Sequence, residues 1–392
     1  MADTFTETTS ESWFSRIIGS IKSVLFGLAL FVISFPVLFW NEGRAVRTAK
    51  SLEEGAGVVV SIPATAVGAG NEGKLVHLSG EATTTDTLAD DAFGVKVTAI
   101  KLERNVEMFQ WEEESRSEKK KKLGGGEETV TTYEYKKTWS SHRIDSSDFK
   151  KPEGHENPSS FPLEAKSLVA GKVTLGAFTL SEDIVGRIDR EENLPVDTGS
   201  LPADKKDRVI AAGDGYFMGR NAASPEIGDV RIDWKVVRPA TVSLVARQVK
   251  DTFEPYQAQA GDAILLLKYG TLSADAMFQA AQKENTIFTW ILRFVGFFMM
   301  FLGLTMIFRP ITVFADVVPI VGTLLGAGLA VFAGLTAAVL SLLTIAVSWI
   351  FFRPVLAISL IVVAVGALAW LIRIGLARRR ARAEASTVRG AA

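Results

Sequence analysis

Histidine serves both acid–base catalysis and metal binding, and this chain has three histidines, His77, His142 and His155. A glutamate follows His155, as in helical zinc motifs, but Pro158 comes three positions later and would break the helix that such a motif needs. His77 lies in a strand-like stretch, where a packed or edge position is the simpler explanation. Cysteine is absent, which excludes disulfides and thiolate chemistry. We therefore predict no metal site and no cofactor.

Other motifs that carry chemistry are missing from the sequence too. It contains no GxSxG elbow, no P-loop, no GxGxxG after a strand and no HExxH helix. Acidic residues are numerous, but no pair stands out from the pattern of a solvated surface. The net charge of −1 gives no reason to expect nucleic acid as a partner. The chain is therefore predicted not to be an enzyme.

Long apolar runs fill the last quarter of the chain, and another lies near its start. A bilayer core requires roughly 20 apolar residues per helix. The run 317–352 is too long for one untilted span, so we predict an interfacial or re-entrant segment at 309–329 before a shorter span. The predicted membrane spans are 24–40, 286–308, 330–352 and 354–373. The expected fold class is an α-helical, four-span, multi-pass membrane protein.

The region 41–285 between the first two spans has the period-two pattern of strands, and we predict a large β-rich α+β domain outside the membrane. The stretch DVRIDWKVV is expected to pair with TVSLVARQV as a hairpin across a turn at Arg238 and Pro239. Aromatic residues alternate in VEMFQWEEE and TVTTYEYKKTW, which predicts a second, longer hairpin with a solvated, lysine-rich tip. Residues 1–23 are expected to form a tail and an interfacial helix that starts near Ser10.

The orientation follows from the distribution of arginine. The segment 374–392 is rich in arginine and contains one acidic residue, Glu384, so the positive-inside rule places it in the cytoplasm. Four spans then return the N-terminus to the cytoplasm and put the 41–285 domain outside or in a lumen. The first span alone favours the opposite orientation, because Arg44, Arg47 and Lys50 follow it closely.

One charged residue, Arg293, lies inside a predicted span, where its long side chain is expected to reach towards the interface. Small residues recur every fourth position in the middle of the apolar region. We call them the small-residue ladder: Gly322, Gly326, Ala330, Gly334 and Ala338. Such spacing lets helices approach closely in lipid. Packing within one chain and self-association of several chains both use it, and the sequence does not choose between them.

Eight segments identify a possible family. In chain order they are NEGRAVRTAKSLEEG, NEGKLVHLSG, KLERNVEMFQWEEE, GHENPSS, EIGDVRIDW, VARQ, GDAILLLKYG and SWIFFRP. This ordered set, which extends over about 26–372, resembles the LUMA family, also called the transmembrane protein 43 family. The resemblance implies four spans, a lumenal domain and cytoplasmic termini. It also implies a self-associating scaffold without enzymatic activity, which in animals lies in the endoplasmic reticulum and inner nuclear membrane with lamin and LINC-type partners.

The chain departs from the family in its alanine- and arginine-rich tail and its glycine-rich hairpin tip. Abundant alanine and absent cysteine lead us to expect a bacterial member in the inner membrane, so the nuclear partners are not carried over. The expected function is a non-enzymatic scaffold that self-associates and organises protein complexes at the membrane or cell envelope. The alternatives are an oligomeric channel or transporter, or a membrane-stress sensor. Expected partners are the lipid bilayer, further copies of the chain and other membrane proteins.

Overall fold

The computed structural model describes residues 3–197, 199, 201–203, 205, 208–360, 362–363, 366, 370 and 373–374. The chain divides into two compact units. Met1–Trp13 and Ser51–Lys283 form the β-rich unit, and Phe14–Lys50 and Glu284–Ala392 form the helical unit. Each unit is described by itself below.

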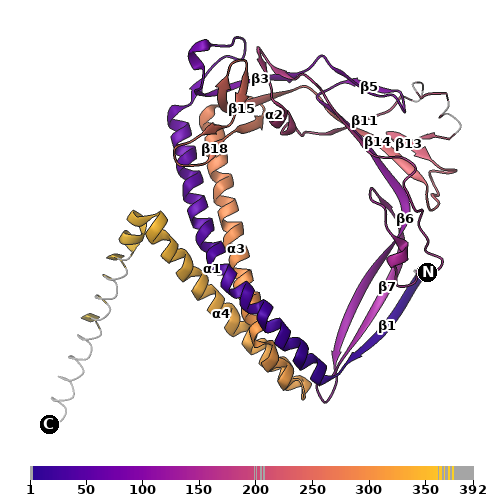
Figure 1. Cartoon of the computed structure of the whole chain (residues 1–392), viewed down its shortest axis with the longest axis vertical. Helices are drawn as coiled ribbons and strands as arrows, with labels where there is room; N and C mark the ends of the chain where they lie inside the picture. The colour runs from indigo at the N-terminus through magenta and orange to yellow at the C-terminus, as the bar shows by residue number, and fades with distance from the viewer. Residues whose placement is uncertain are drawn as a thin grey trace, which may run out of the picture. The chain divides into compact units, whose positions relative to one another are not determined.

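Within the described residues, three helices are long and apolar enough to cross a membrane (Figure 1). They are α1 (Trp13–Val58), α3 (Ala274–Ala315) and α4 (Pro319–Phe352). Residues 354–360 are also helical. The rest of the span predicted at 354–373 lies largely outside the described residues, as does the arginine-rich tail from 375 onwards.

The helix boundaries differ from the sequence prediction in the middle of the apolar region. Helix α3 continues through Arg309 and Pro310, and α4 runs without a break from Pro319 to Phe352, so 309–329 is not a separate segment. Proline at the first turn of a helix lacks only an N–H that has no intrahelical partner there, so Pro319 suits the start of α4. The turn between the two helices falls at Asp316–Val318 instead.

The first large sheet of the β-rich unit has the strand order β1-β7-β6-β14-β13-β12, with β8 beside β6 and β11 beside β14. Its strands are β1 (Asp3–Glu11), β6 (Lys101–Lys121), β7 (Glu127–Ser140), β8 (Lys166–Val169), β11 (Glu192–Leu194), β12 (Ile210–Ala212), β13 (Gly215–Met218) and β14 (Val230–Val237). Buried aromatic side chains, including Phe93, Tyr216 and Trp234, fill the core on one face.

The second large sheet has the order β10-β9-β3-β15-β16, with β19 beside β15 and β2 parallel to β3. Its strands are β2 (Val60–Ser61), β3 (Leu75–Thr83), β9 (Thr174–Leu175), β10 (Phe178–Thr179), β15 (Ala240–Val249), β16 (Thr252–Glu254) and β19 (Leu266–Tyr269). Two small ribbons, β4 (Thr87–Asp90) with β5 (Val95–Thr98) and β17 (Tyr256–Gln257) with β18 (Ala263–Ile264), and the short helix α2 (Glu182–Gly186) complete the unit.

The hairpin predicted from DVRIDWKVV and TVSLVARQV is wrong. Strand β14 pairs with β6, β11 and β13, whereas β15 pairs with β3, β16 and β19 in the other sheet. The two residues between them, Arg238 and Pro239, carry the chain from one sheet to the next. Proline lacks the N–H that a continuing ladder requires. Strand β15 buries residues on both faces, as a central strand does, and it has three partners of its own in the second sheet, β3, β16 and β19.

The long hairpin predicted from alternating aromatics is present as β6 and β7, which pair from Met108 opposite Ser140 to Lys121 opposite Glu127. Phe109 packs on Trp139 with ring centroids 5.0 Å apart. Trp111 contacts Lys137 of β7 and the ring of His155, each at 4.8 Å.

The N-terminal segment belongs to this sheet rather than to a separate tail. Strand β1 pairs with β7 from Asp3 opposite Tyr135 to Glu11 opposite Glu127, and the helix expected from Ser10 begins at Trp13. Apart from half-buried Glu7, every residue of β1 is exposed. The strand is held mainly by backbone hydrogen bonds, with side-chain contacts from Lys150 Nζ to Glu7 at 2.8 Å and from His155 Nε2 to Asp3 at 3.1 Å.

Tyr135 is the most deeply buried tyrosine on β7 and has an ordered polar environment. Its hydroxyl donates to Glu113 at 2.7 Å and accepts from the backbone N–H of Lys151 at 2.9 Å, while its ring stacks on His155. Burial is the main cause, and the hydrogen bond to Glu113 the second, of the rise in the pKa of Tyr135 to about 12. The side chain therefore resists ionisation while the sheet is folded.

Raising the pH above 10 should destabilise the β-rich unit through Tyr135. Between its unfolded pKa of 10 and its folded pKa of about 12, the unfolded chain loses a proton that the folded chain keeps, so the free energy of unfolding falls as pH rises. The full loss is about 3 kcal/mol. Denaturant unfolding of the full chain in mild detergent at a series of pH values measures it. Tyr135→Phe should flatten this dependence, and the control Tyr256→Phe should leave it intact; equal slopes in both variants would contradict the assignment.

Candidate functional site

One group of buried polar residues in the helical unit lies where α1, α3 and α4 meet. Asn41, Glu42 and Arg44 come from α1, directly after the predicted end of the first span, and Asn41 and Glu42 are fully buried. The sequence prediction placed these residues in the domain outside the membrane, directly after the first span. Helix α1 continues through them to Val58, and the side chains of Asn41 and Arg44 bond to α3. We call this set, with its partners on α3 and α4, the polar cluster.

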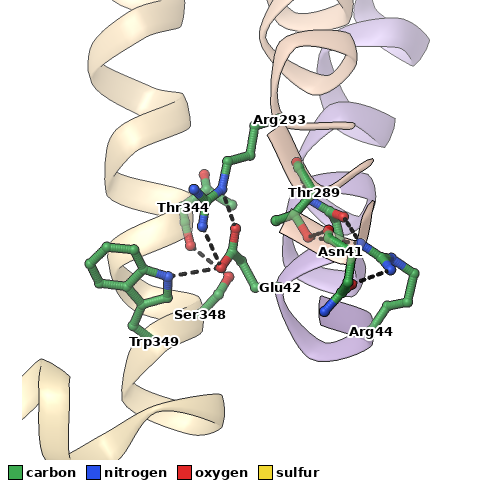
Figure 2. A network of polar contacts seen from close by, with 9 residues as sticks. Asn41, Glu42, Arg44, Thr289, Arg293, Thr344, Ser348 and Trp349 are labelled. Carbon is green, nitrogen blue, oxygen red and sulfur yellow. Dashed lines mark hydrogen bonds and ion pairs between the residues drawn. The ribbon is translucent and has the colours of Figure 1, made fainter. Parts of the chain in front are cut away.

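Glu42 forms the centre of the polar cluster (Figure 2). Arg293 of α3 binds it with two parallel hydrogen bonds, Nε to Oε1 at 2.7 Å and Nη2 to Oε2 at 2.9 Å. The indole N–H of Trp349, near the end of α4, donates to Oε2 at 2.8 Å. Glu42 is fully buried, and the Arg293 side chain is 13% exposed. One carboxylate therefore joins three helices, and its charge is compensated by a bidentate guanidinium.

A second part of the polar cluster lies beside the first and joins α1 to α3 (Figure 2). Arg44 donates to Asn285 Oδ1 and to Thr289 Oγ1, both at 2.9 Å. Asn41 donates to the carbonyl of Thr289 at 3.0 Å, and Asn285 donates to the carbonyl of Ala45 at 3.0 Å. Residues 285, 289 and 293 recur every four positions, so they line one face of α3.

Glycines bring α1 and α3 close together between the polar cluster and the start of α1. A Cβ at Gly27 would lie 2.7 Å from the carbonyl oxygen of Gly303, and a Cβ at Gly303 would lie equally close to that of Gly27. Neither position can therefore hold a side chain without moving backbone. Close backbone approach of this kind is how helices pack in lipid.

A second buried ion pair lies at the other end of these helices. Arg16 Nη2 of α1 contacts Asp316 Oδ2, in the turn after α3, at 2.7 Å, and both side chains are at most 9% exposed. Arg16 and Glu42 are separated along α1 by about 39 Å at the rise of an α-helix. A bilayer is about 30 Å thick in its hydrocarbon core and about 40–45 Å with its headgroup regions. The two ion pairs are thus spaced to lie near opposite membrane interfaces.

Only one member of the small-residue ladder is tightly packed against another part of the chain. Gly322 is buried, and a Cβ there would lie 2.0 Å from Asp316 Oδ1. The other four members, Gly326, Ala330, Gly334 and Ala338, are half-buried. A Cβ at Gly326 or Gly334 would meet a neighbour no closer than 3.7 Å, an ordinary contact. The buried face of α4 passes instead through Ala333, Ala337, Ser341 and Ser348.

In the polar cluster, the buried charges of Glu42 and Arg293 are paired with each other. The three histidines do not meet: His77 contacts Ser61 and the carbonyl of Leu272, His142 lies beside Ser141, and His155 is buried against Tyr135. Among the described residues, no group of three or more His, Asp or Glu side chains could hold a metal ion. The sequence analysis identified Arg293 but missed Glu42. An arginine inside a membrane span needs an acidic partner, and that requirement could have directed attention to Glu42.

Comparisons with known proteins agree on one family. The family described as Transmembrane protein 43 matches residues 108–354. Transmembrane protein 43 of Mus musculus is 36% identical over 363 residues, which cover 89% of this chain and 90% of that protein. The Homo sapiens protein is 35% identical over 364 residues, 90% of each chain. The Drosophila melanogaster homolog is 30% identical over 356 residues, 89% of this chain and 94% of its own.

No solved structure matches the chain. The relatives named above are animal proteins, so they give no support to the bacterial origin expected from the composition.

Removing the carboxylate of Glu42 should unfold the helical unit more easily, because Arg293 would then be buried without its counter-charge. Glu42→Ala should cost about 3–5 kcal/mol. Replacing both partners by methionine should cost much less, since no charge is then left unpaired. Glu107→Ala breaks a partly exposed pair with Arg231 in the β-rich unit and should cost under about 1 kcal/mol. Unfolding in mild detergent, followed by circular dichroism, compares them. Equal costs for Glu42→Ala and Glu107→Ala would exclude a structural role for the Glu42 pair.

Proposed function

This chain belongs to the transmembrane protein 43 family, and on that premise we propose that it is a non-enzymatic membrane scaffold, which self-associates and organises other membrane proteins. The chain is an integral membrane protein with three apolar helices long enough to span a bilayer and a large β-rich unit. The observation that carries the proposal is the polar cluster. It uses the buried charges of the helices to hold those helices to one another.

The use of these charges also argues against transport. Ion- and proton-coupled transporters place ionisable groups near mid-membrane, where they bind and release their cargo. Glu42 and Arg293 neutralise each other at one end of the bundle, and Arg16 and Asp316 do so at the other. Opening such a pair costs several kcal/mol. A fixed helical platform is the simpler use of this chemistry.

The absence of enzymatic activity is part of the same proposal. The polar side chains that are buried in the β-rich unit serve as structural partners: Asp90 binds Arg104 and the indole of Trp234, and Gln110 bonds the backbone around residues 142–144. A surface hollow of about 460 Å³ between β8 and α2 is lined by surface residues such as Lys101, Glu103 and Val169. Lys101 there is engaged with the carbonyl of Gly186.

For the topology we propose four spans, with the β-rich unit and the arginine-rich tail on opposite sides. The fourth span and the tail rest on the sequence, through the apolar run at 354–373 and the positive-inside rule. A strand on one side of a bilayer cannot pair with a strand on the other, so a full crossing by α1 requires β1 to leave β7. Because β1 is almost wholly exposed, its release removes little apolar surface from burial.

Cysteine labelling tests this topology in a chain that has no cysteine of its own. Single cysteines at Thr6, Lys121 and Ala391 report on β1, the β6–β7 tip and the tail. Four spans predict that Thr6 and Ala391 react with a membrane-impermeant reagent from one side and Lys121 from the other. Labelling of Lys121 and Ala391 from the same side would reject the four spans. If Thr6 instead reacts together with Lys121, β1 stays paired with β7 and α1 does not cross.

Self-association is proposed for the half-buried part of the small-residue ladder, which leaves room for a second backbone. Gly326→Leu combined with Gly334→Leu should lower the oligomer mass in mild detergent, measured by size exclusion with light scattering, while the β-rich unit stays folded. Gly328→Leu is the matched control, because a Cβ at Gly328 meets nothing within 4 Å. An unchanged oligomer in the double variant would assign the ladder to the lipid-facing surface. Misfolding of the double variant alone would assign it to packing within one chain.

A further inference from the structure

A groove of about 220 Å³ lies between α3 and α4, next to the polar cluster. Its principal lining residues are Trp290, Arg293, Phe294, Ala338, Leu342 and Ile345. The groove exists because α4 presents small side chains, Ala338 and Ser341, opposite the large rings of α3. Its walls are apolar except at Ser341, whose hydroxyl contacts Met300, and at the end where Arg293 lies.

Arg293 keeps one side of its guanidinium available at that end. Its Nε and Nη2 atoms are bound to Glu42, and its guanidinium carbon lies 4.7 Å from the ring of Trp290. In the part of the chain that the structure describes, no protein acceptor bonds Nη1, and the side chain remains 13% exposed. Because Glu42 already balances the charge, the free N–H groups suit a neutral oxygen acceptor as well as an anionic one.

The tryptophans around the groove indicate where it lies along the membrane normal. Trp40 and Trp290 are more than half exposed, at 56% and 54%, and Trp349 lies at the same level through its bond to Glu42. Exposed tryptophans gather at the membrane–water interface, where the ester groups of lipids also lie. From this level the groove passes along α3 from Trp290 to Phe297 and along α4 from Ile345 to Ala338, both in the direction of the Arg16–Asp316 pair. It therefore enters the hydrocarbon region.

We propose that this groove is a phospholipid-binding site, in which one acyl chain of a glycerophospholipid lies between α3 and α4 and an ester carbonyl accepts a hydrogen bond from Arg293 Nη1. The occupant follows from the combination of an apolar trough and a single set of donors at its interfacial end. An apolar side chain from a second copy would fill the trough but would leave the donors unused. The site requires the three membrane helices, and it does not depend on the scaffold role.

Native mass spectrometry of the full chain tests the site, after delipidation in detergent and addition of phosphatidylcholine. The wild type should retain one phospholipid per chain. Ala338→Trp fills the trough and should lower retention at least about tenfold. Leu342→Trp, at the exposed edge of the groove, provides a second filling variant if the first fails to fold. Val347→Trp is the matched control, because Val347 is an exposed residue on the opposite face of the same helix, and it should retain lipid as the wild type does.

Two outcomes would overturn the proposal. Equal retention in Ala338→Trp, Leu342→Trp and Val347→Trp, with all three folded by circular dichroism, would mean that lipid binds elsewhere. A wild type that retains no phospholipid, together with a filling variant of lower oligomer mass, would mean that a second chain occupies the groove. Since oligomer mass is measured on the same samples, loss of lipid with an unchanged oligomer supports the site independently of self-association.

Discussion

The ion pair between Glu42 and Arg293 determines how the helices of this protein meet. A charge buried among apolar helices is very unfavourable without its partner, while the pair itself adds little net stability over an apolar contact. The effect of such a pair is therefore on specificity. Among the alignments in which the apolar faces of α1 and α3 could meet, only one brings Glu42 to Arg293. The bond from Trp349 extends the same requirement to α4.

The other contacts of the helical unit agree with that single alignment. Arg16 pairs with Asp316, Gly27 touches Gly303, and Asn285 reaches the carbonyl of Ala45, so α1 and α3 remain antiparallel and in register over their shared length. Prolines inside both helices do not interrupt this alignment. The polar contacts at the two ends of the helices fix their register. The glycines in the middle allow the two backbones to come close enough for van der Waals contact.

Local sequence patterns predicted those features that depend on neighbouring residues. The apolar runs around α1, α3 and α4 and the alternating aromatics of β6 and β7 were visible because each element carries its own periodicity. The assignment of β14 and β15 to different sheets was not, because the strands of a sheet are chosen by long-range pairing. Strand β1 was missed because its exposed threonines and acids bury nothing. The Glu42–Arg293 pair joins positions 251 apart, and no sequence pattern around either residue identifies the other as its partner.

The same chemical device stabilises a carboxylate in each unit. In the β-rich unit, Asp90 is buried, Arg104 Nη1 donates to both of its oxygens at 2.9 Å, and the indole of Trp234 donates to Oδ2 at 3.1 Å. In the helical unit, Glu42 receives a guanidinium and the indole of Trp349 in the same way. An arginine cancels the charge but leaves lone pairs of the carboxylate unsatisfied. A tryptophan meets that need because its N–H is a donor only and its ring is apolar. The indole therefore satisfies the buried carboxylate without bringing a further charge or an unpaired acceptor into the core, which explains why one solution serves a sheet and a helical bundle alike.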